Sequence, residues 1–485
     1  MRKLSVYIFS LLLFAGCARV PKNDLAQTID APPIASTESR GTSFFAKGEW
    51  PSEKWWEMFQ DPQLNQLIER ALSQNFSLKE AHAKVETAYQ LAKKQRARLL
   101  PDLSGNYVEQ WQYLSKYGFD RDFFPMPPGA AQGIPHTLNL IDLTLNFSYE
   151  FDFWGKNRDL FRAALGRAQA DVAEEKQARL LIAIKVAEAY FSLQTKLAQQ
   201  EVLLDKRQER KDFLFLRDMR CKAGLDDALP LYASEKRIHQ VQKLLVFLEE
   251  GIELDRHTLK YLISAGPQEK VIESLPIAHY DAPFPLPDNI ESDLIARRPD
   301  LIAQIWRVEA AAKEIGAAKA DFYPNINLGA FAGLESLSFG NLFRDSKMGG
   351  LTPAIHLPIF TGGRLEAQLK SKVWAFNEAV FSYNDLVLKA AKEVADQICT
   401  VRATCEGLTE QTEMFEDSSS EYALVALRYE KGLDNLLNVL QREDEVLQQR
   451  FLLAGLYNDH LLSLLKLIKS LGGGYYSSKK VEGHG

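Results

Sequence analysis

The 485-residue sequence has few of the residues that build catalytic and metal sites. It contains four cysteines and eight histidines. The histidines stand singly between His82 and His484, and neither a Cys-x-x-Cys nor a His-Glu-x-x-His sequence occurs. A Gly-x-Ser-x-Gly sequence and a phosphate-binding loop are also missing. We therefore expect no catalytic residue, no metal site and no cofactor, and the chain is not predicted to be an enzyme.

The chain also lacks an excess of basic residues. It has 58 Lys and Arg against 64 Asp and Glu, a net charge of -6, and no basic stripe of the kind that binds phosphates. Nucleic-acid binding is therefore not expected. Apart from Cys17, the cysteines are Cys221, Cys399 and Cys405, and the six-residue spacing of the last two places them on different helix faces. This odd set predicts neither a disulfide framework nor a metal site.

The N-terminus has the features of an export signal. A basic pair precedes the apolar run 4–14, which is too short to cross a bilayer as a helix. Ala15-Gly16-Cys17 follows and resembles the lipobox of bacterial lipoproteins, although Phe14 stands where Leu is usual. We expect a signal peptide over 1–16, lipid attachment such as palmitate at Cys17, and a Pro/Ser/Thr-rich tether over 17–50. The alternative is an ordinary secretory signal with a chance cysteine.

The stretch from Leu143 to Phe153 alternates strictly, with apolar residues at every odd number and polar residues at every even number. Since successive side chains of a strand point to opposite faces, this pattern predicts a strand with one apolar and one polar face. Its length matches a tilted strand that crosses a bilayer, roughly 9 to 11 residues. A half-buried strand of a soluble sandwich would alternate in the same way, so the rest of the chain must decide.

Long helices follow this strand. Between Asn157 and Arg220 the sequence has no proline and one glycine, and is rich in good helix formers. A continuous helix over these residues would reach about 95 Å, and only a coiled coil or a helical tube buries an apolar stripe of that length. Gly224 is suited to the left-handed position after a helix end, and the aspartates that follow are suited to capping the next helix. A returning helix is expected over 230–264.

The second half of the sequence repeats the first. Residue n matches residue n+223 before the first strand loop and n+208 after it, as in Pro101 with Pro324 and Gly224 with Gly432. Each half is predicted to be a helix (Leu64 to Leu100 in the first), two strands, a long helix, a tight turn and a second helix. The predicted segments are repeat 1 over 51–285, repeat 2 over 286–472, a polar tail over 473–485, strands at about 103–111, 143–153, 325–334 and 351–360, and turns at 220–227 and 428–435.

Four strands cannot close a barrel in lipid, because the smallest such barrels have eight. An open sheet edge in hydrocarbon would leave backbone N–H and C=O groups unpaired. The chain is therefore expected to assemble with copies of itself, and three copies give twelve strands and twelve helical staves. The predicted fold class is mainly α with a membrane β-barrel portion and two internal repeats, in which a homotrimer forms a 12-stranded β-barrel continued by a long α-helical barrel.

Several segments resemble the outer-membrane efflux proteins of the TolC/OprM type, specifically the lipoprotein branch that serves resistance-nodulation-division pumps. They are spread over nearly all of the chain after residue 50, and together they are specific to this family. The similar segments are 55–67, 151–155, 294–301 (Leu-Ile-Ala-Arg-Arg-Pro-Asp-Leu), 316–327, 357–363, 428–435 (Arg-Tyr-Glu-Lys-Gly-Leu-Asp-Asn) and 471–474.

The resemblance implies a conduit anchored in the outer membrane that extends into the periplasm and tapers to a closed tip. The tip would contact a periplasmic adaptor (membrane-fusion) protein bound to an inner-membrane pump, through residues Arg220, Gly224, Leu225, Asp226, Arg428, Tyr429, Gly432 and Leu433. In this family a Leu and, one helical turn later, an Asp narrow the tip. The matching residues are Leu437 and Gln441, so the acidic residue is replaced; Asp434, Glu443 or Asp444 could supply the negative charge instead.

The function that follows is passive conduction of drugs or other small molecules from the pump out of the cell. Two alternatives remain open at this stage. The same architecture could serve as the outer-membrane duct of type I protein secretion, and the long coiled coil could belong to a non-conducting envelope spacer lipoprotein. The alternating strand disfavours the spacer, which would not need it. The transported substrates and the particular pump and adaptor are not encoded in these patterns.

Overall fold

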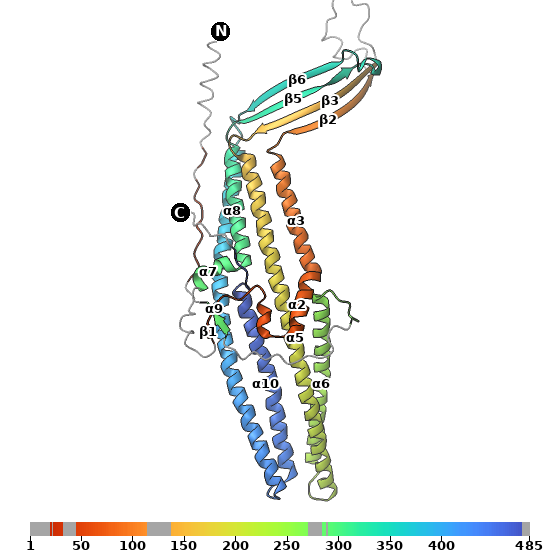
Figure 1. Ribbon diagram of the computed structural model, residues 1–485, viewed down its shortest axis with the longest axis vertical. Coiled ribbons are helices and arrows are strands. Elements are labelled where there is room, and N and C mark those ends of the chain that lie inside the picture. The colour runs from red at the N-terminus through yellow and green to blue at the C-terminus, as the bar shows by residue number, and fades with distance from the viewer. Residues whose placement is uncertain are drawn as a thin grey trace, which may run out of the picture. The chain divides into compact units, whose positions relative to one another are not determined.

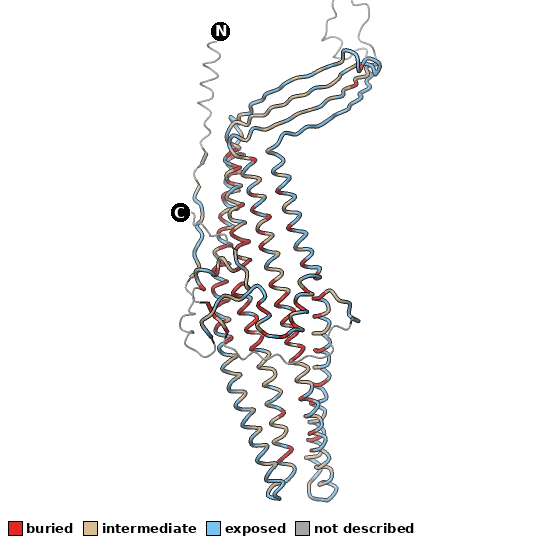
Figure 2. The backbone as a smooth tube through the Cα atoms, in the orientation of Figure 1, coloured by how far each residue is buried: buried red, intermediate tan, exposed pale blue. Residues whose placement is uncertain are grey.

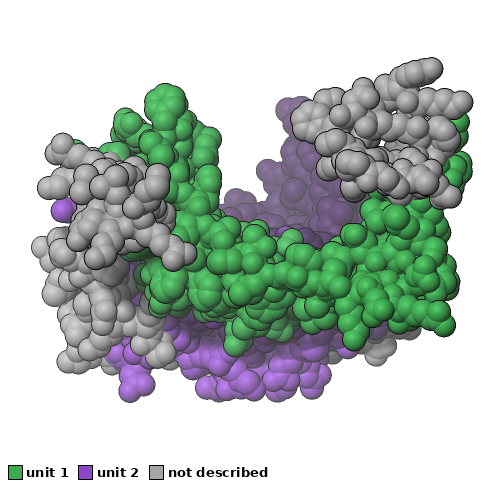
Figure 3. Space-filling view, turned by 90° about the horizontal axis from the view of Figure 1, so that it is seen from above, with its two compact units in different colours: residues 1–26, 86–168, 306–380 green, residues 27–85, 169–305, 381–485 purple. Residues whose placement is uncertain are grey.

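The computed structural model describes residues 20–21, 23–32, 45–113, 137–269, 284–287 and 290–477 (Figure 1). The expected signal peptide and Cys17 lie outside the described residues. The chain forms two compact units, shown in Figure 3. Unit 1 comprises residues 1–26, 86–168 and 306–380, and unit 2 comprises residues 27–85, 169–305 and 381–485. Each unit therefore takes segments from both halves of the repeated sequence.

Unit 1 contains a four-stranded antiparallel sheet of strand order β2-β3-β5-β6 (Figure 1). The alternation predicts its faces correctly. Because paired residues of antiparallel strands share a face, the register extends the apolar face of β3 to its neighbours. The row through Phe147 is apolar in all four strands and reads Leu103–Phe147–Ala330–Leu351. The row through Leu143 reads Tyr107–Leu143–Leu334 and ends in the charged Lys347, and Phe331 lies on the other face, paired with Asn146. The strands are β2 (Asp102–Tyr113), β3 (Thr137–Phe151), β5 (Asn325–Ser336) and β6 (Lys347–His356).

The observed strands differ from the predicted ranges at their ends. β2 and β5 extend at most two residues beyond the predicted ends, whereas β3 and β6 differ more. β3 begins at Thr137 instead of 143, because its first six residues do not keep the strict alternation. It ends at Phe151 instead of 153, because the Asp152 carboxylate accepts from the backbone N–H groups of Asn157 (3.0 Å) and Arg158 (2.9 Å), at the start of the next helix. β6 begins at Lys347 instead of 351 and ends at His356 instead of 360, where Pro358 has no N–H to continue the ladder.

The predicted helix over 64–100 is two helices, α2 (Pro62–Gln74) and α3 (Phe76–Ala97). Asn75 separates them with an extended backbone. Its side-chain oxygen accepts from the N–H groups of Ser77 (2.8 Å) and Leu78 (3.3 Å), as an N-cap does, and its Nδ2 donates to the Leu262 carbonyl (2.8 Å). Helical periodicity continues across the break, which is why the pattern alone did not reveal it.

The remaining helices follow the predicted repeat. α5 and α9 both contain 67 residues, and every bound of α9 lies 208 positions after the matching bound of α5. α3 and α8 both contain 22 residues and correspond at the offset of 223. These helices and the short elements are α5 (Lys156–Lys222), α6 (Leu229–Leu262), α7 (Ile290–Arg297), α8 (Pro299–Ala320), α9 (Arg364–Glu430), α10 (Leu436–Ser470), the 3-10 helices η2 (Trp55–Phe59) and η3 (Phe339–Asn341), and the strands β1 (Phe45–Lys47) and β4 (Phe284–Leu286).

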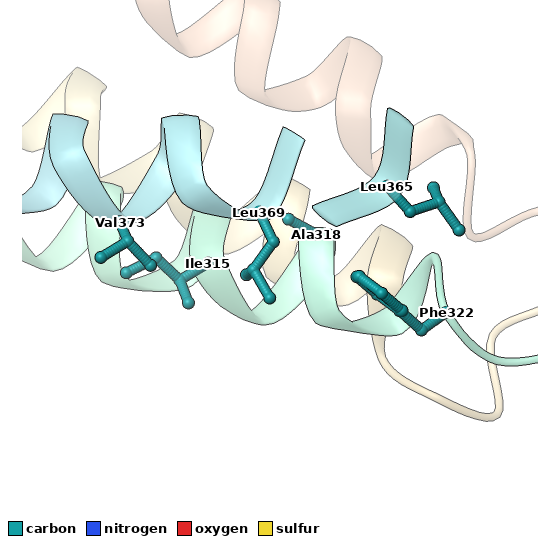
Figure 4. Close-up of a cluster of buried hydrophobic side chains, with 6 residues drawn as sticks. All are labelled: Ile315, Ala318, Phe322, Leu365, Leu369 and Val373. Atoms are coloured by element: carbon teal, nitrogen blue, oxygen red, sulfur yellow. The ribbon is translucent and has the colours of Figure 1, made fainter. Parts of the chain in front are cut away.

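Each unit has its own core (Figure 2). In unit 1, α8 packs on the first turns of α9 through a buried cluster, shown in Figure 4: Ile315, Ala318, Phe322, Leu365, Leu369 and Val373. In unit 2, Asp61 caps α2 and also accepts from the buried Tyr190 hydroxyl (2.6 Å), which ties this helix to α5. α10 is long and apolar enough to cross a membrane by length and composition, but Leu464, Leu465 and Leu467 are buried in this core.

Candidate functional site

The candidate site is built from the two turns that join the long helices, both of which belong to unit 2. At the first turn α5 ends at Lys222, and Gly224 adopts a left-handed backbone with φ of +72°. The N–H of Leu225 donates to the Arg220 carbonyl (2.9 Å), which closes the helix end in the manner of a Schellman motif. The Asp227 carboxylate then accepts from the N–H of Leu229, the first residue of α6 (3.0 Å). The predicted left-handed backbone of Gly224 is confirmed. The prediction that both aspartates cap α6 is wrong for Asp226, which binds arginines instead, and the N-cap position itself is Ala228.

Asp226 is the electrostatic centre of the first turn. Its carboxylate receives two bonds from the Arg220 guanidinium (2.9 and 3.0 Å) and one from Arg217 (3.0 Å). The hydrogen bond from Arg220, supported by Arg217, lowers the pKa of Asp226 to about 2. Asp226 is therefore ionised at any physiological pH, and the ion pair fixes the conformation of the turn.

The second turn repeats this construction. Gly432 has a φ of +70°, and the N–H of Leu433 donates to the Arg428 carbonyl (2.8 Å). Arg428 also pairs with Asp434 (3.4 Å), in the positions that match Arg220 and Asp226. Asn438 donates to Asp434 (2.7 Å), and this bond, with the N–H of Asn435, lowers the pKa of Asp434. Asp434 therefore carries its charge but uses it to hold the turn.

Apolar side chains project from both turns. In the single chain Leu225 is 67% exposed and Leu433 is 71% exposed, and Tyr429 is also exposed. Figure 2 shows both turns in the colour of exposed residues. In a Schellman motif the residue in the position of Leu225 or Leu433 often packs back on its own helix. Here the two leucines remain exposed, which makes them available to another surface.

The residues expected to form the constriction lie on the first turns of α10. Leu437 is half-buried and Gln441 is exposed, whereas the neighbouring Val439 and Leu440 are buried. Val439 and Leu440 therefore supply the packing of α10 within its own chain. Leu437 and Gln441 are four residues apart, so they lie on one face of the helix. Glu443, the other acidic candidate here, is half-buried, and burial together with Asp212 and Asp205 raises its pKa.

A charged cluster that the sequence did not reveal lies between α5 and α10. Asp444, one of the residues expected to be able to supply negative charge at the constriction, pairs with Lys206 (3.2 Å) and Arg210. Lys206 also donates to Gln448 (2.9 Å), so two successive helical turns of α10, at Asp444 and at Gln448, are bonded to α5. Lys206 and Arg210 are four residues apart on one face of α5, a spacing too common to predict an interhelical contact.

Glu209 lies in this cluster and is only 3% exposed. Its nearest partner is Arg210 (3.5 Å), and neither of its carboxylate oxygens has a hydrogen bond. Burial, with the nearby charge of Asp444, raises the pKa of Glu209 to about 8. Glu209 is therefore mostly protonated at neutral pH and loses its proton in mildly alkaline solution.

Comparison with known proteins places this geometry among outer-membrane channels. A family model described as outer membrane efflux protein matches residues 67–263 and 291–473. The multidrug resistance outer membrane protein MdtP of Escherichia coli K12 is 30% identical over 482 residues, which cover 98% of this chain and 96% of MdtP. The fusaric acid resistance protein FusA of Burkholderia cepacia is 32% identical over 76% of this chain and 68% of its own length.

Solved structures show the same fold. The outer membrane protein VceC of Vibrio cholerae superposes with a TM-score of 0.74 at 32% identity, covering 88% of this chain and all of VceC. The CmeC outer membrane channel of Campylobacter jejuni has a TM-score of 0.82 over 96% of each chain. Its identity is 20%, so this second match supports the fold alone.

Proposed function

Because this chain belongs to the outer membrane efflux protein family, we propose that three copies of it assemble into the outer-membrane channel of a tripartite efflux system. The chain is an outer-membrane efflux channel, and members of this family conduct passively. The proposal concerns how the channel is assembled, where it is closed and what it contacts.

The two edge strands of the sheet support the proposal of a trimer. β2 and β6 are the edge strands of the four-stranded sheet, and each pairs with one strand among the described residues. The apolar face of this sheet is suited to lipid, where an unpaired edge would be costly because no water is available to its N–H and C=O groups. Pairing β2 of one chain with β6 of the next removes both edges, and three chains close a barrel of twelve strands.

The two turns support a docking surface for the periplasmic adaptor. Leu225 and Leu433 extend from turns that ion pairs hold in fixed conformations, so a partner meets preformed apolar residues. Preformed sites lose less conformational entropy on binding than flexible ones. The neighbouring Tyr429, Arg220 and Arg428 give the surface aromatic and basic groups. The adaptor in turn would connect the channel to an inner-membrane pump.

The constriction is proposed at Leu437, with Gln441 one turn away. In a trimer these residues form two rings of three around the axis, provided that their face of α10 lines the lumen. A ring of leucines closes a narrow pore by excluding water. Because Gln441 is neutral and Asp434 is bonded to Arg428, the leucine ring rather than an acidic ring would dominate this level.

The names of the relatives suggest which molecules the channel conducts. MdtP is named for multidrug resistance and FusA for resistance to fusaric acid, so small organic molecules are the proposed cargo. These names favour efflux over the protein-secretion alternative. The four-stranded sheet with its apolar face, in turn, argues against a non-conducting spacer. We further propose that Cys17 carries lipid and anchors each chain in the outer membrane.

A measurement of mass and conductance tests the assembly. Three chains of 54.9 kDa should give a detergent-solubilised protein of about 165 kDa by light scattering, after correction for detergent. The same preparation should insert into planar bilayers and give discrete conductance steps. A stable monomer with full β-sheet content, or a trimer that never conducts even after variants of Leu437, would contradict the proposal.

A further inference from the structure

The described N-terminal residues 23–32 lie along α9 in an extended form, and two asparagines of that helix bind them. Asn377 is 6% exposed. Its side-chain oxygen accepts from the N–H of Ala26 (2.9 Å), and its Nδ2 donates to the Asp24 carbonyl (3.5 Å). One amide side chain thus bonds an acceptor and a donor that flank Leu25 in the segment.

Asn384 makes the same pair of bonds one heptad further along α9. Its side-chain oxygen accepts from the N–H of Ile29 (3.0 Å), and its Nδ2 donates to the Gln27 carbonyl (3.0 Å). These two groups flank Thr28 just as the first pair flanks Leu25. Both contacts use the backbone of the segment only, and Leu25 and Ile29 keep 50% and 37% of their side-chain surface exposed.

The spacing of the two contacts is matched on the helix and on the segment. Asn377 and Asn384 are seven helical residues apart, which is about 10.5 Å. The bonded groups of the segment are three residues apart, which is about 9 to 10 Å of extended chain. A segment that is bound at Asn377 therefore arrives at Asn384 in register, without a bulge or a stretch.

We propose that Asn377 and Asn384 form a two-point clamp that binds the backbone of segment 24–29 and so determines where the lipid-bearing N-terminus leaves the helix. The clamp rests on the proposed function for its consequence, the placement of the lipid on Cys17. Asn377 and Asn384 are positioning residues in this scheme.

The segment runs along α9 towards the start of that helix, so the clamp affects where the N-terminal residues lie. Towards the N-terminus, Val20 packs on the cluster of Figure 4, which involves Leu365, Leu369 and Val373 of the first turns of α9. In unit 1, α9 begins eight residues after β6 ends. The clamp and Val20 therefore hold the described N-terminal residues along α9 up to its first turns, which follow the sheet that is proposed to lie in the membrane.

The internal repeat supports a specific role for these asparagines. At the offset of 208, Asn377 corresponds to Gln169 of α5, and Asn384 corresponds to Lys176. The two long helices share length and bounds, but only α9 carries a pair of asparagines at these positions. Only one N-terminal segment exists per chain, so only one of the two repeats needs a clamp.

Hydrogen exchange on the purified full-length trimer tests the clamp. The amides of Ala26 and Ile29 should exchange slowly in the wild type, and their protection should be lost in the double variant Asn377→Ala/Asn384→Ala. The matched control is Glu378→Ala/Asp385→Ala, which changes the exposed residue next to each asparagine and should leave both amides protected. Unchanged protection in the asparagine variant, measured on a folded trimer, would overturn the clamp.

Two further variants separate the clamp from the proposed lipid anchor and from side-chain packing. Leu25→Ser should keep both amides protected, because the asparagines bind only backbone groups of the segment. Loss of protection in this variant would mean that side-chain packing, not the asparagines, holds the segment. Cys17→Ser should also retain protection, whether or not the wild type carries lipid. If palmitate labelling shows no lipid while the asparagine variant still loses protection, the clamp stands and the anchoring part of the proposed function fails.

Discussion

Arg220 and Asp226 hold the first turn, and the equivalent pair Arg428 and Asp434 holds the second. The two pairs are not equal, because Arg217 strengthens the first and Asn438 supports the second. The sequence explains this difference, since the repeat places valine where Arg217 stands and proline where Asn438 stands. Single residues therefore make two turns of common geometry different in charge.

The constriction is tested by two single substitutions. Leu437→Ala should raise the conductance of the channel in planar bilayers, because smaller side chains leave room for water in the proposed ring. Gln441→Asp should chiefly increase cation preference, because it adds three carboxylates next to the ring. If Leu437 instead packs only against a neighbouring helix, Leu437→Ala would lower thermal stability, by about 2–5 kcal/mol for a buried leucine, and leave conductance unchanged.

The buried Glu209 predicts a pH dependence of stability. Its pKa in the folded protein is raised to about 8 from an ordinary value of 4.5, so the folded state holds a proton that the unfolded state has released between these values. This stabilisation is complete below about pH 4.5 and is lost as the pH rises through 8. We expect Glu209→Gln, which stays uncharged, to melt at a higher temperature than the wild type at pH 9 and to approach it at pH 5.

The exposed Glu201 on the same helix provides the control for this measurement. Glu201→Gln also removes one carboxylate from α5, but its side chain is 66% exposed. Its melting temperature relative to the wild type should differ little between pH 5 and pH 9. An equal difference for both variants at both pH values would show that Glu209 is not the titrating group.

At the scale of elements, the faces of a strand follow from its own sequence, whereas the buried face of a long helix depends on the helices that pack against it. The alternation of β3 specifies its two faces without any partner, and the register then extends the apolar face to β2, β5 and β6. The long helices do not carry such a strong local signal. α5 is tied to α10 by Lys206, Arg210 and Asp444, and these contacts determine which face of each helix is buried.

The sheet predicts opposite results for neighbouring substitutions on β3. Phe147→Asp places a charge on the apolar face, which costs on the order of 2–4 kcal/mol per chain near the middle of a bilayer. We expect it to abolish the trimer on heated detergent gels. Ser148→Asp places the same charge on the polar face and should be tolerated. Equal loss of the trimer in both variants would argue against lipid contact of the apolar face.

At the scale of the whole molecule, the sequence repeat and the compact units divide the chain differently. The repeat runs through successive halves, whereas each compact unit combines segments of both. Helices that leave one unit continue in the other, as α5 and α9 do. The two halves therefore cannot be separated as independent domains, because each supplies part of the core of both units.

The exposed leucines of the turns predict how the channel meets its adaptor. Leu225→Asp together with Leu433→Asp should abolish crosslinking to the periplasmic adaptor and drug export in cells, because charges replace the apolar contacts. The variant should keep the trimer and its single-channel conductance, since neither leucine packs in its own chain. Loss of the trimer would assign these residues to assembly, and unaltered export would remove them from the adaptor surface.

The repeat, the two faces of the strands and the turns at Gly224 and Gly432 can be predicted from the sequence alone. These features depend on contiguous residues: side-chain alternation follows from strand geometry, and a left-handed backbone after a helix favours glycine. They are therefore readable before any tertiary contact is known. The bounds of α8, α9 and β5 coincide with those of α3, α5 and β2 at the predicted offsets.

The contacts between distant segments arise from the packing of the helices and cannot be predicted from local patterns. Arg210 and Asp444 are 234 positions apart, and Ala26 and Asn377 are 351 positions apart. No local pattern specifies which helix faces meet, because the same polar residues are equally suited to solvent. Glu209 shows the reason most clearly, since its raised pKa comes from burial, and burial is a property of the packed helices rather than of the residues beside it in the chain.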